Sequence, residues 1–358
     1  MRAYNFNAGP AALPLPVLEE AQRELVDFQG TGMSIMEHSH RGAAYDKVHN
    51  EALSLMRELL SVPASHEILF LQGGASTQFA MVPMNFLRPG ASADYVVTGQ
   101  WGLKAFEEAQ RVGKPRLAYD GLENGSYRRI PTQVEYDANA AYVHITSNNT
   151  LEGTQYREFP HTTAPLVADM CSDLLWRPID VSKFALIYAG AQKNIGPSGV
   201  TVVIAAKEFL AQAREDLPNV LRYAIFAKEN SLYNTPPTFA IYLTRGVLAW
   251  TKAQGGLVAI EKRNRDKAGL VYGAMDVAPQ LYSSPVAKAD RSMMTVVFRL
   301  PNADLEKAFL SGAEATGMVG LKGHRSTGGV RASLYNAVPV AAAEALAEYM
   351  GEFARTHG

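Results

Sequence analysis

The sequence predicts an α/β protein with a large domain built on a mostly parallel sheet and a small C-terminal α+β domain. At 358 residues the chain exceeds the ~250–300 residues at which one hydrophobic core stops growing. Apolar runs, loops and helical segments alternate up to about residue 210, a rhythm typical of a sheet flanked by helices. A strand–helix–strand–strand–helix pattern begins at residue 293. We therefore expect a large domain at 16–258, a small domain at 259–358, and an N-terminal arm at 1–15 that packs near the small domain.

Each element is predicted from the spacing of its apolar residues and from the turn residues at its ends. In the large domain we expect helices at 16–29, 44–60, up to 86, 103–112 and 239–254. Its strands are expected at 67–71, 95–98, 114–119, 142–145 and 166–169, with one more that ends near Gly190 and another that begins after Gly199. Residues 121–132 should form turns. A long helix from 257 to about 275 should lead to strands at 293–300, 318–321 and 329–335 and helices at 303–316 and 338–356.

Composition excludes several classes of function. The formal net charge of −1 argues against a general nucleic-acid-binding or membrane-surface protein, because both need an excess of basic residues. No apolar run approaches the ~20 residues of a membrane span. The single cysteine, Cys171, precludes an intrachain disulfide and fits a reducing compartment. We therefore expect a soluble, cytoplasmic protein whose partners are small molecules.

One lysine stands at a turn between two apolar runs. The run from Ala185 ends in small residues and is followed by Lys193, a Gly-Pro-Ser-Gly turn and a second run from Val200. Burial disfavours the charged form of an amine, and the free amine can form a Schiff base with a carbonyl such as the aldehyde of pyridoxal phosphate (PLP). An isolated lysine at a strand end more often directs its amine to solvent.

A carboxylate one strand earlier changes that balance. Asp169 ends the apolar run that starts at Leu166. A carboxylate in this position can pair with the protonated pyridine nitrogen of PLP while Lys193 holds the aldehyde. A lone aspartate after a strand is more often a turn or cap residue. The pair together favours PLP chemistry.

Three further features suit a cofactor and an anionic substrate. Small residues at 72–77 separate a strand from a helix, so their N–H groups can bind a phosphate, although many such turns bind nothing. Trp101 follows a strand end, where a flat ring could cover a cofactor, although a tryptophan is more often part of the core. Arg331 alternates with apolar residues in a strand, and a half-buried guanidinium needs a partner such as a carboxylate. The histidines of the loop at 37–42 have no third ligand nearby, so we predict no metal site.

Several segments, in order, resemble the phosphoserine aminotransferases, a family of PLP-dependent class V transaminases. They are Asn5–Pro10, Met36–Gly42, Tyr188–Gly199, Asn234–Phe239, Lys322–Arg325 and Gly329–Asn336. The resemblance covers nearly the whole chain. It implies PLP as cofactor, the type I, aspartate-aminotransferase-like fold of PLP-dependent transferases, and a homodimer with shared active sites.

The resemblance also implies a role for individual residues. It assigns Lys193 and Asp169 to catalysis and to cofactor binding. Further cofactor contacts are assigned to the amides of Ala75 and Ser76, the ring of Trp101, and Thr150 and Gln192, with Asn234 and Thr235 reaching the cofactor phosphate of the other subunit. Substrate contacts are assigned to His40, Arg41, His324 and Arg325 for the distal anion and to Arg331 for the α-carboxylate.

The implied reaction converts 3-phosphohydroxypyruvate and L-glutamate into O-phospho-L-serine and 2-oxoglutarate in serine biosynthesis, with ping-pong kinetics. The same pocket could act mainly on phosphohydroxythreonine in pyridoxine biosynthesis. A PLP-fold binding protein without turnover is the alternative of another class, and the intact Lys193, Asp169 and Arg331 argue against it. Two positions depart from the commonest family pattern: Ser76 stands where some members have arginine, and Cys171 where a serine is common.

Overall fold

The structure, a computed structural model, describes residues 2–325 and 327–358. Its first half contains β1 (Tyr4–Asn5), α1 (Leu15–Glu24), η1 (Phe28–Gly30), α2 (Ala43–Leu59), β2 (His66–Leu71), α3 (Gly74–Phe86), β3 (Asp94–Val97), α4 (Gln100–Val112), β4 (Arg116–Asp120), β5 (Leu122–Glu123), β6 (Ser126–Tyr127), β7 (Val143–Thr146), β8 (Asn148–Asn149), β9 (Thr154–Gln155) and β10 (Leu166–Asp169). Its second half contains η2 (Val181–Lys183), β11 (Leu186–Gly190), β12 (Thr201–Ala206), α5 (Lys207–Leu210), η3 (Asn219–Leu221), α6 (Tyr223–Lys228), α7 (Thr238–Ala253), α8 (Gly256–Val277), η4 (Lys288–Asp290), β13 (Thr295–Phe298), α9 (Ala303–Ala315), β14 (Met318–Val319), β15 (Val330–Ser333) and α10 (Val340–His357).

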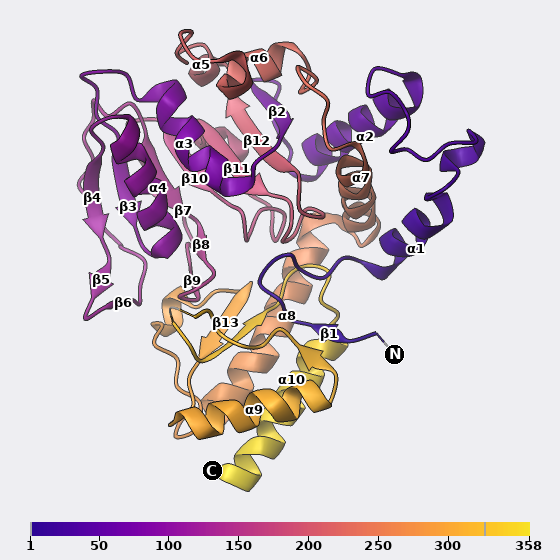
Figure 1. The fold of residues 1–358 in the computed structure, drawn as a ribbon. Helices are drawn as coiled ribbons and strands as arrows, with labels where there is room; N and C mark the ends of the chain where they lie inside the picture. Colours follow the sequence, from indigo (N-terminus) through magenta and orange to yellow (C-terminus); the bar gives the residue numbers. More distant parts are fainter. Residues whose placement is uncertain (1, 326) are drawn as a thin grey trace.

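A seven-stranded sheet forms the centre of the large part of the molecule, in the order β2-β12-β11-β10-β7-β3-β4 (Figure 1). All neighbours from β11 to β4 run parallel, whereas β12 is antiparallel to both β11 and β2. Only β12 therefore opposes the other strands, and the predicted α/β architecture with a mostly parallel sheet is confirmed. Parallel strands bring their carboxyl ends to one edge, where ligands bind in such sheets.

Helices cover both faces of this sheet because side chains alternate along each strand. On β2, Ile68 and Phe70 face the core cluster that contains α2 and α7, whereas Leu69 and Leu71 face the cluster that contains α3 and α4. The strands β7, β10 and β11 are buried throughout. Burial on both faces is what a parallel sheet covered by helices on two sides requires.

A third core cluster belongs to the C-terminal part of the chain, where α8, α9 and α10 pack on β13 and β15 (Figure 1). The helix α8 joins the two parts, since Leu257 lies in the first cluster and Val271 in the third. The expected domain boundary after residue 258 falls in the first turn of this helix. The arm reaches the same region, because β1 pairs with β14 in parallel and Phe6 is buried in the third cluster.

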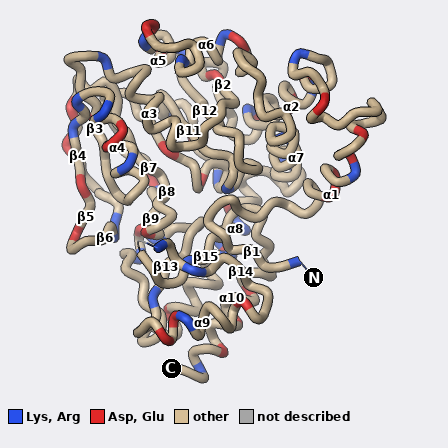
Figure 2. Tube along the Cα trace, in the orientation of Figure 1, with Lys and Arg blue, Asp and Glu red and all other residues tan. Residues whose placement is uncertain are grey.

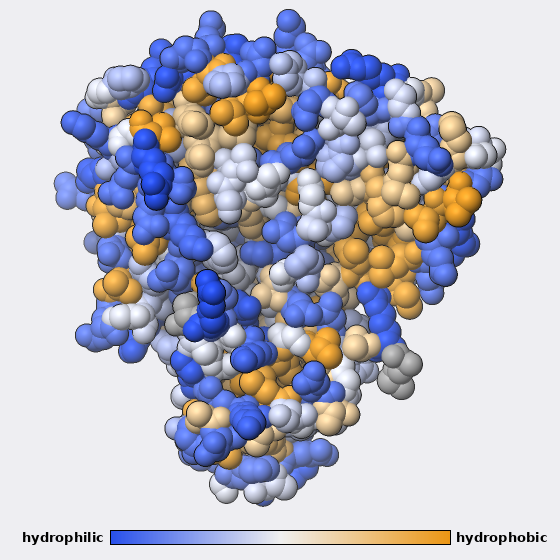
Figure 3. All heavy atoms as spheres, in the orientation of Figure 1, coloured by the Kyte–Doolittle hydropathy of each residue, from blue (hydrophilic) through white to orange (hydrophobic). Residues whose placement is uncertain are grey.

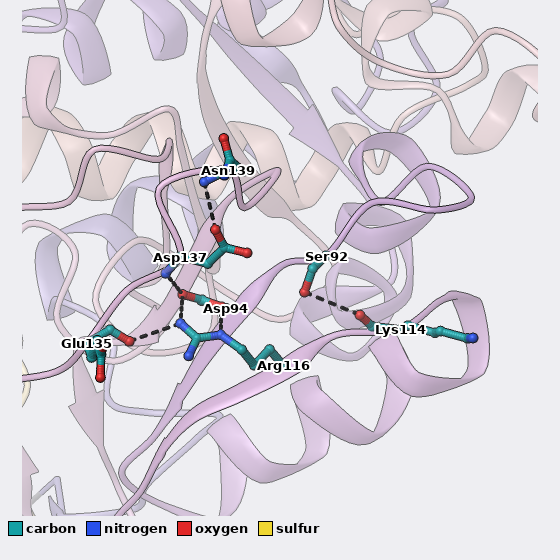
Figure 4. Close-up of polar contacts among 7 residues, drawn as sticks. All are labelled: Ser92, Asp94, Lys114, Arg116, Glu135, Asp137 and Asn139. Atoms are coloured by element: carbon teal, nitrogen blue, oxygen red, sulfur yellow. Dashed lines mark hydrogen bonds and ion pairs between the residues drawn. The ribbon is translucent and has the colours of Figure 1, made fainter.

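An ion pair between a buried carboxylate and a partly exposed guanidinium holds the β3–β4 edge of the sheet (Figure 4). Asp94 is fully buried and accepts two hydrogen bonds from the Arg116 guanidinium, at 2.7 and 2.5 Å. The Asp137 amide donates to the same carboxylate at 2.7 Å, and the guanidinium also donates to the Glu135 carbonyl oxygen at 2.9 Å. The loop that leads to β7 is thereby attached to this edge.

Two predicted elements differ from the structure. The helix expected at 16–29 ends at Glu24, and a short 3-10 turn follows in which Gln29 has a φ of 53°. Residues 121–132, expected as turns, include the small antiparallel pair β5–β6.

Acidic and basic residues are interspersed along both parts of the chain (Figure 2). Among the described residues, no helix combines the length and the apolar character needed to cross a membrane.

Candidate active site

A cavity of about 470 Å³ opens where the carboxyl ends of β7, β10 and β11 meet the first turn of α3. Nine residues predicted for the site line it: Ala75, Ser76, Trp101, Thr150, Asp169, Gln192, Lys193, His324 and Arg331. A wider hollow of about 1010 Å³, along residues 130–136 and 156–161, contains none of them. The smaller cavity is therefore the candidate active site.

Lys193 enters the cavity from the turn between β11 and β12. Its side chain is half-buried, and its Nζ donates no hydrogen bond to any residue that the structure describes. The arm packs against this turn, because the Ala11 amide donates to the Gln192 carbonyl oxygen at 2.8 Å. The amine is thus held between buried strands with its nitrogen available for reaction.

Asp169 is the last residue of β10 and is only 4% exposed. Its Oδ1 accepts a hydrogen bond from the Cys171 amide at 2.9 Å, and Cys171 Sγ accepts one from the Gly190 amide at 3.1 Å. Burial raises the pKa of Asp169, and the hydrogen bonds from Cys171 and the charge of Lys193 oppose that shift. Cys171 therefore supports the carboxylate, and Asp169 is a buried anion that a cationic ligand would stabilise.

Trp101 forms one wall of the cavity from the first turn of α4. Its Nε1 donates to Thr150 Oγ1 at 3.1 Å, which fixes the plane of the indole. Lys104, one turn further along the helix, places its Nζ 4.7 Å from the centre of the ring. A flat ligand can therefore stack on a ring whose orientation is set by a hydrogen bond.

The phosphate-binding turn predicted at 72–77 leads directly into α3. Gly73 has a φ of 90°, and a Cβ there would lie 2.0 Å from Thr77 Oγ1, so a side chain is excluded at this position. The first amides of a helix have no partner within it and carry the positive end of its dipole. Because Gly74, Ala75 and Ser76 line the cavity, these amides form a site for an anion.

Cationic side chains gather on the opposite side of the cavity. Arg331 in β15 donates from Nη1 to the Thr150 carbonyl oxygen at 3.3 Å, while its Nε is buried without a hydrogen-bond partner in the described part of the chain. The pKa of His324 is lowered by burial and by the charges of Arg331, Arg325 and Lys104. These groups repel one another unless an anion lies among them.

Four predicted residues lie away from this cavity. His40 and Arg41 precede α2, and Arg41 is exposed and donates to the Leu232 carbonyl oxygen at 3.5 Å. Asn234 and Thr235 are exposed on the loop before α7, where Asn234 lines a separate hollow of about 360 Å³. The two segments thus lie side by side. Arg325 is exposed and does not line the cavity either.

Sequence reasoning missed some residues of the site. The arm contributes Ala8 and Gly9 to the cavity wall, and Asn148 and Ser172 also line it. Lys104 was missed although its position three residues after Trp101 in a helix places both on one face. The arm was expected to pack near the small domain, but no signal in the sequence placed it in the cavity wall, because that position depends on the pairing of β1 with β14.

Comparisons with known proteins agree with this geometry. The sequence profile described as Aminotransferase class-V matches residues 3–346. A phosphoserine aminotransferase from Geobacillus kaustophilus is 57% identical over 99% of both chains. The solved phosphoserine aminotransferase from Bacillus circulans subsp. alkalophilus has a TM-score of 0.97 at 53% identity and covers 100% of this chain and 99% of its own. A PLP-bound phosphoserine aminotransferase from Trichomonas vaginalis has a TM-score of 0.93 at 38% identity, over 98% of this chain and 99% of its own.

Proposed function

The chain belongs to the class-V aminotransferase family, and we propose that it transfers the amino group of L-glutamate to 3-phosphohydroxypyruvate. The products are 2-oxoglutarate and O-phospho-L-serine, and the reaction serves serine biosynthesis. The observation that carries this proposal is the meeting of Lys193, Asp169 and Arg331 in one cavity of a chain more than half identical to phosphoserine aminotransferases. These relatives do not favour phosphohydroxythreonine as the main substrate.

The residues around the cavity fit PLP, which the family uses. The volume of about 470 Å³ lies within the ~300–1,000 Å³ typical of cofactor sites. The Asp169 carboxylate makes no ion pair with any described residue and suits a protonated ring nitrogen. The amides at the start of α3 suit the phosphate, and the Trp101 indole suits the aromatic ring. When bound, PLP supplies an aldehyde that links to amines and a ring that withdraws electrons from the substrate Cα.

Each residue then has a defined task in the reaction. Lys193 holds the cofactor and moves the proton at the substrate Cα. Asp169 keeps a negative charge beside the ring nitrogen. Arg331 binds the substrate α-carboxylate, and His324 and Arg325 bind the distal anion. Because glutamate and the phosphorylated keto acid use the same cavity in turn, the kinetics should be ping-pong.

We propose a homodimer in which His40, Arg41, Asn234 and Thr235 complete the partner's cavity. The side of the molecule that carries α1 has an exposed hydrophobic surface (Figure 3). Large apolar residues in the segment that ends just before His40 are strongly exposed: Leu15 47%, Leu25 42%, Val26 80%, Met33 42% and Met36 51%. Apolar surface on this scale indicates an interface, and Arg41 contacts the segment next to Asn234.

A coupled assay with 3-phosphohydroxypyruvate and glutamate tests the reaction. Phosphoserine should form in proportion to 2-oxoglutarate, and the absorption of the bound cofactor should change when glutamate is added alone. No turnover with this pair, together with turnover of phosphohydroxythreonine, would replace the substrate. A protein that binds PLP and turns over neither compound would be a binding protein.

Mixed dimers test the shared site. Lys193→Ala and Arg41→Ala homodimers should each be defective. An isologous dimer has two equivalent sites. In a mixed dimer, the cavity with an intact Lys193 receives the intact Arg41 of the other subunit, and the second cavity lacks both residues. Because random mixing makes half of the dimers mixed, and half of their sites are complete, it should restore about a quarter of wild-type activity. If Arg41 served its own chain, no mixed cavity would be complete and mixing would restore nothing.

We place the enzyme in the cytoplasm, in agreement with its single buried cysteine.

A further inference from the structure

The turn between β8 and β9 is hydrogen-bonded to the segment that leads from β3 into α4. Asn149 Nδ2 donates to Thr98 Oγ1 at 3.0 Å, just after β3. Two residues into α4, the Trp101 indole donates to Thr150 Oγ1 at 3.1 Å. Asn149, Thr98 and Thr150 are all buried. The turn is therefore a fixed support for the part of the chain that carries Trp101.

A third hydrogen bond joins Glu152, in the same turn, to the start of α4. Glu152 Oε1 accepts at 2.8 Å from the amide of Gln100, the first residue of the helix. Gly99, which precedes the helix, has no side chain that could cap it. The first amides of a helix have no partner within it, and a side-chain acceptor placed there stabilises the helix start. Glu152 therefore supplies the missing N-cap of α4 from 52 residues away in the sequence.

The close approach of the turn to the helix depends on Gly99. A Cβ at this position would lie 2.4 Å from Asn149 Oδ1 and 2.9 Å from Glu152 Oε2. The φ of Gly99 is 178°, an extended conformation that any residue can adopt. The glycine is thus required for space. Because only 7% of Glu152 is exposed, its carboxyl group is enclosed between the turn and the helix start.

These contacts hold the Trp101 side chain at both of its ends. Thr150 holds the indole nitrogen, whereas Glu152 holds the peptide group directly before Trp101. With the indole bond alone, a shift of the helix start would still tilt the ring about its nitrogen. Because Trp101 lines the active-site cavity, such a tilt would change the surface that a flat ligand meets.

We propose that Glu152 is a positioning residue for the cofactor: by capping α4 it holds the Trp101 indole in the plane that stacks on the ring of PLP. The group that acts is Oε1 as a hydrogen-bond acceptor, and the charge of the carboxylate is not needed for this role. The proposal rests on the PLP binding proposed above. An indole that is already in place loses no further freedom when the cofactor binds, so the cap should contribute to cofactor affinity.

Titration of the cofactor-free protein with PLP tests this role. Glu152→Ala should raise the Kd for PLP about three- to tenfold, within what the loss of a helix N-cap can supply. Glu152→Gln should restore most of the affinity, because its oxygen can still accept from the Gln100 amide. Glu152→Asp keeps the charge but is too short to reach that amide and should resemble Glu152→Ala. Glu158→Ala removes an exposed carboxylate nearby and is the matched control, with the Kd of the wild type. If Glu152→Asp restored the affinity and Glu152→Gln did not, the charge would be the acting feature and the proposal would be wrong.

A double-mutant cycle with Trp101→Ala shows whether the effect passes through the indole. Substitutions that act through one contact are not additive, whereas independent ones are. In the Trp101→Ala background, Glu152→Ala should therefore raise the Kd for PLP by less than about twofold. The same three- to tenfold rise in both backgrounds would mean that Glu152 acts on the cofactor by another route, which would overturn the proposal.

Hydrogen exchange in the cofactor-free protein tests the cap without any ligand. Mass spectrometry of peptides that contain Gln100 and Trp101 should show faster exchange in Glu152→Ala than in the wild type, and a rate close to the wild type in Glu152→Gln. Equal exchange in all three proteins would show that Glu152 does not hold the start of α4. If exchange differed as expected but no protein bound PLP, the proposed function would fail while the cap would stand. If PLP bound equally well to all three, the function would stand and the positioning role would fail.

Discussion

Replacing Asp169 by asparagine should change stability and turnover in opposite directions. Asparagine has the same shape and its oxygen can still accept from the Cys171 amide, so the fold should be kept. In the cofactor-free protein the substitution removes a buried charge that has no ion-pair partner in the described residues. The variant should therefore be at least as stable as the wild type. The negative charge of Asp169 should therefore be favourable only when the bound cofactor supplies a positive partner for it.

The effect on turnover follows from the loss of one charge-assisted hydrogen bond to the ring nitrogen. Such a bond contributes roughly 1.5–3 kcal/mol, or about ten- to a hundredfold in rate. Single-turnover measurements with glutamate should show this loss, while Lys193 should still be modified by PLP and borohydride. Unchanged half-reaction rates would refute the assignment of Asp169.

The stability difference should also depend on pH in a defined direction. Burial raises the pKa of Asp169, so the folded protein holds this proton more tightly than the unfolded chain. The stability of the cofactor-free wild type should therefore fall, relative to the variant, as pH rises from the ordinary pKa of a carboxyl group through the raised pKa of Asp169 in the folded protein. Thermal unfolding at several pH values should show the two proteins converging in acid. A difference that grows in acid would contradict this reasoning.

Three other predictions concern different parts of the molecule. Lys193→Ala should abolish turnover and the borohydride-stable attachment of PLP; attachment at another lysine, found by mass spectrometry, would contradict the assignment. Arg331→Ala should raise KM for every substrate, whereas Arg41→Ala should do so, by roughly ten- to a hundredfold, only for substrates with a distal anion, with alanine as control. Asp94→Ala should lower the free energy of unfolding by roughly 1.5–3 kcal/mol, because it removes the charge-assisted hydrogen bonds that Asp94 accepts, while the Arg116 side chain that remains is 41% exposed. Urea unfolding measures this loss, and a change below about 1 kcal/mol would show that the pair is a surface interaction.

Local sequence patterns brought together the two residues proposed for catalysis. Asp169 ends one buried strand and Lys193 follows the next, and these strands are neighbours, with Asp169 opposite Tyr188. Because parallel strands end at one edge, the order of the strands along the chain was enough to bring the two residues together. Trp101 was placed for the same reason, although the helix that carries it begins one turn earlier than expected.

The proposed substrate contacts could not be placed in this way. His40 and Arg41 lie in a loop, and the cavity that a loop serves depends on contacts far away in the sequence, which in the proposed dimer include those of a second chain. Glu152 was missed because a glutamate in a turn usually faces solvent. Its burial depends on the packing of that turn against Gly99, at the start of a helix some 50 residues earlier. Sequence patterns reflect the residues that are close along the chain, so they do not predict contacts between segments that are far apart in the sequence.

The pairing of β1 with β14 also sets the order of events during protein synthesis. Tyr4 pairs with Met318, so the arm leaves the ribosome long before its partner strand exists. At ~5–20 residues per second this interval lasts roughly 15–60 s. During that time the sheet can form, but Phe6 has no core to enter and the wall of the cavity near Lys193 is open. A nascent chain released early would therefore leave the Phe6 side chain exposed to chaperones, and the enzyme should acquire its cavity only as translation ends.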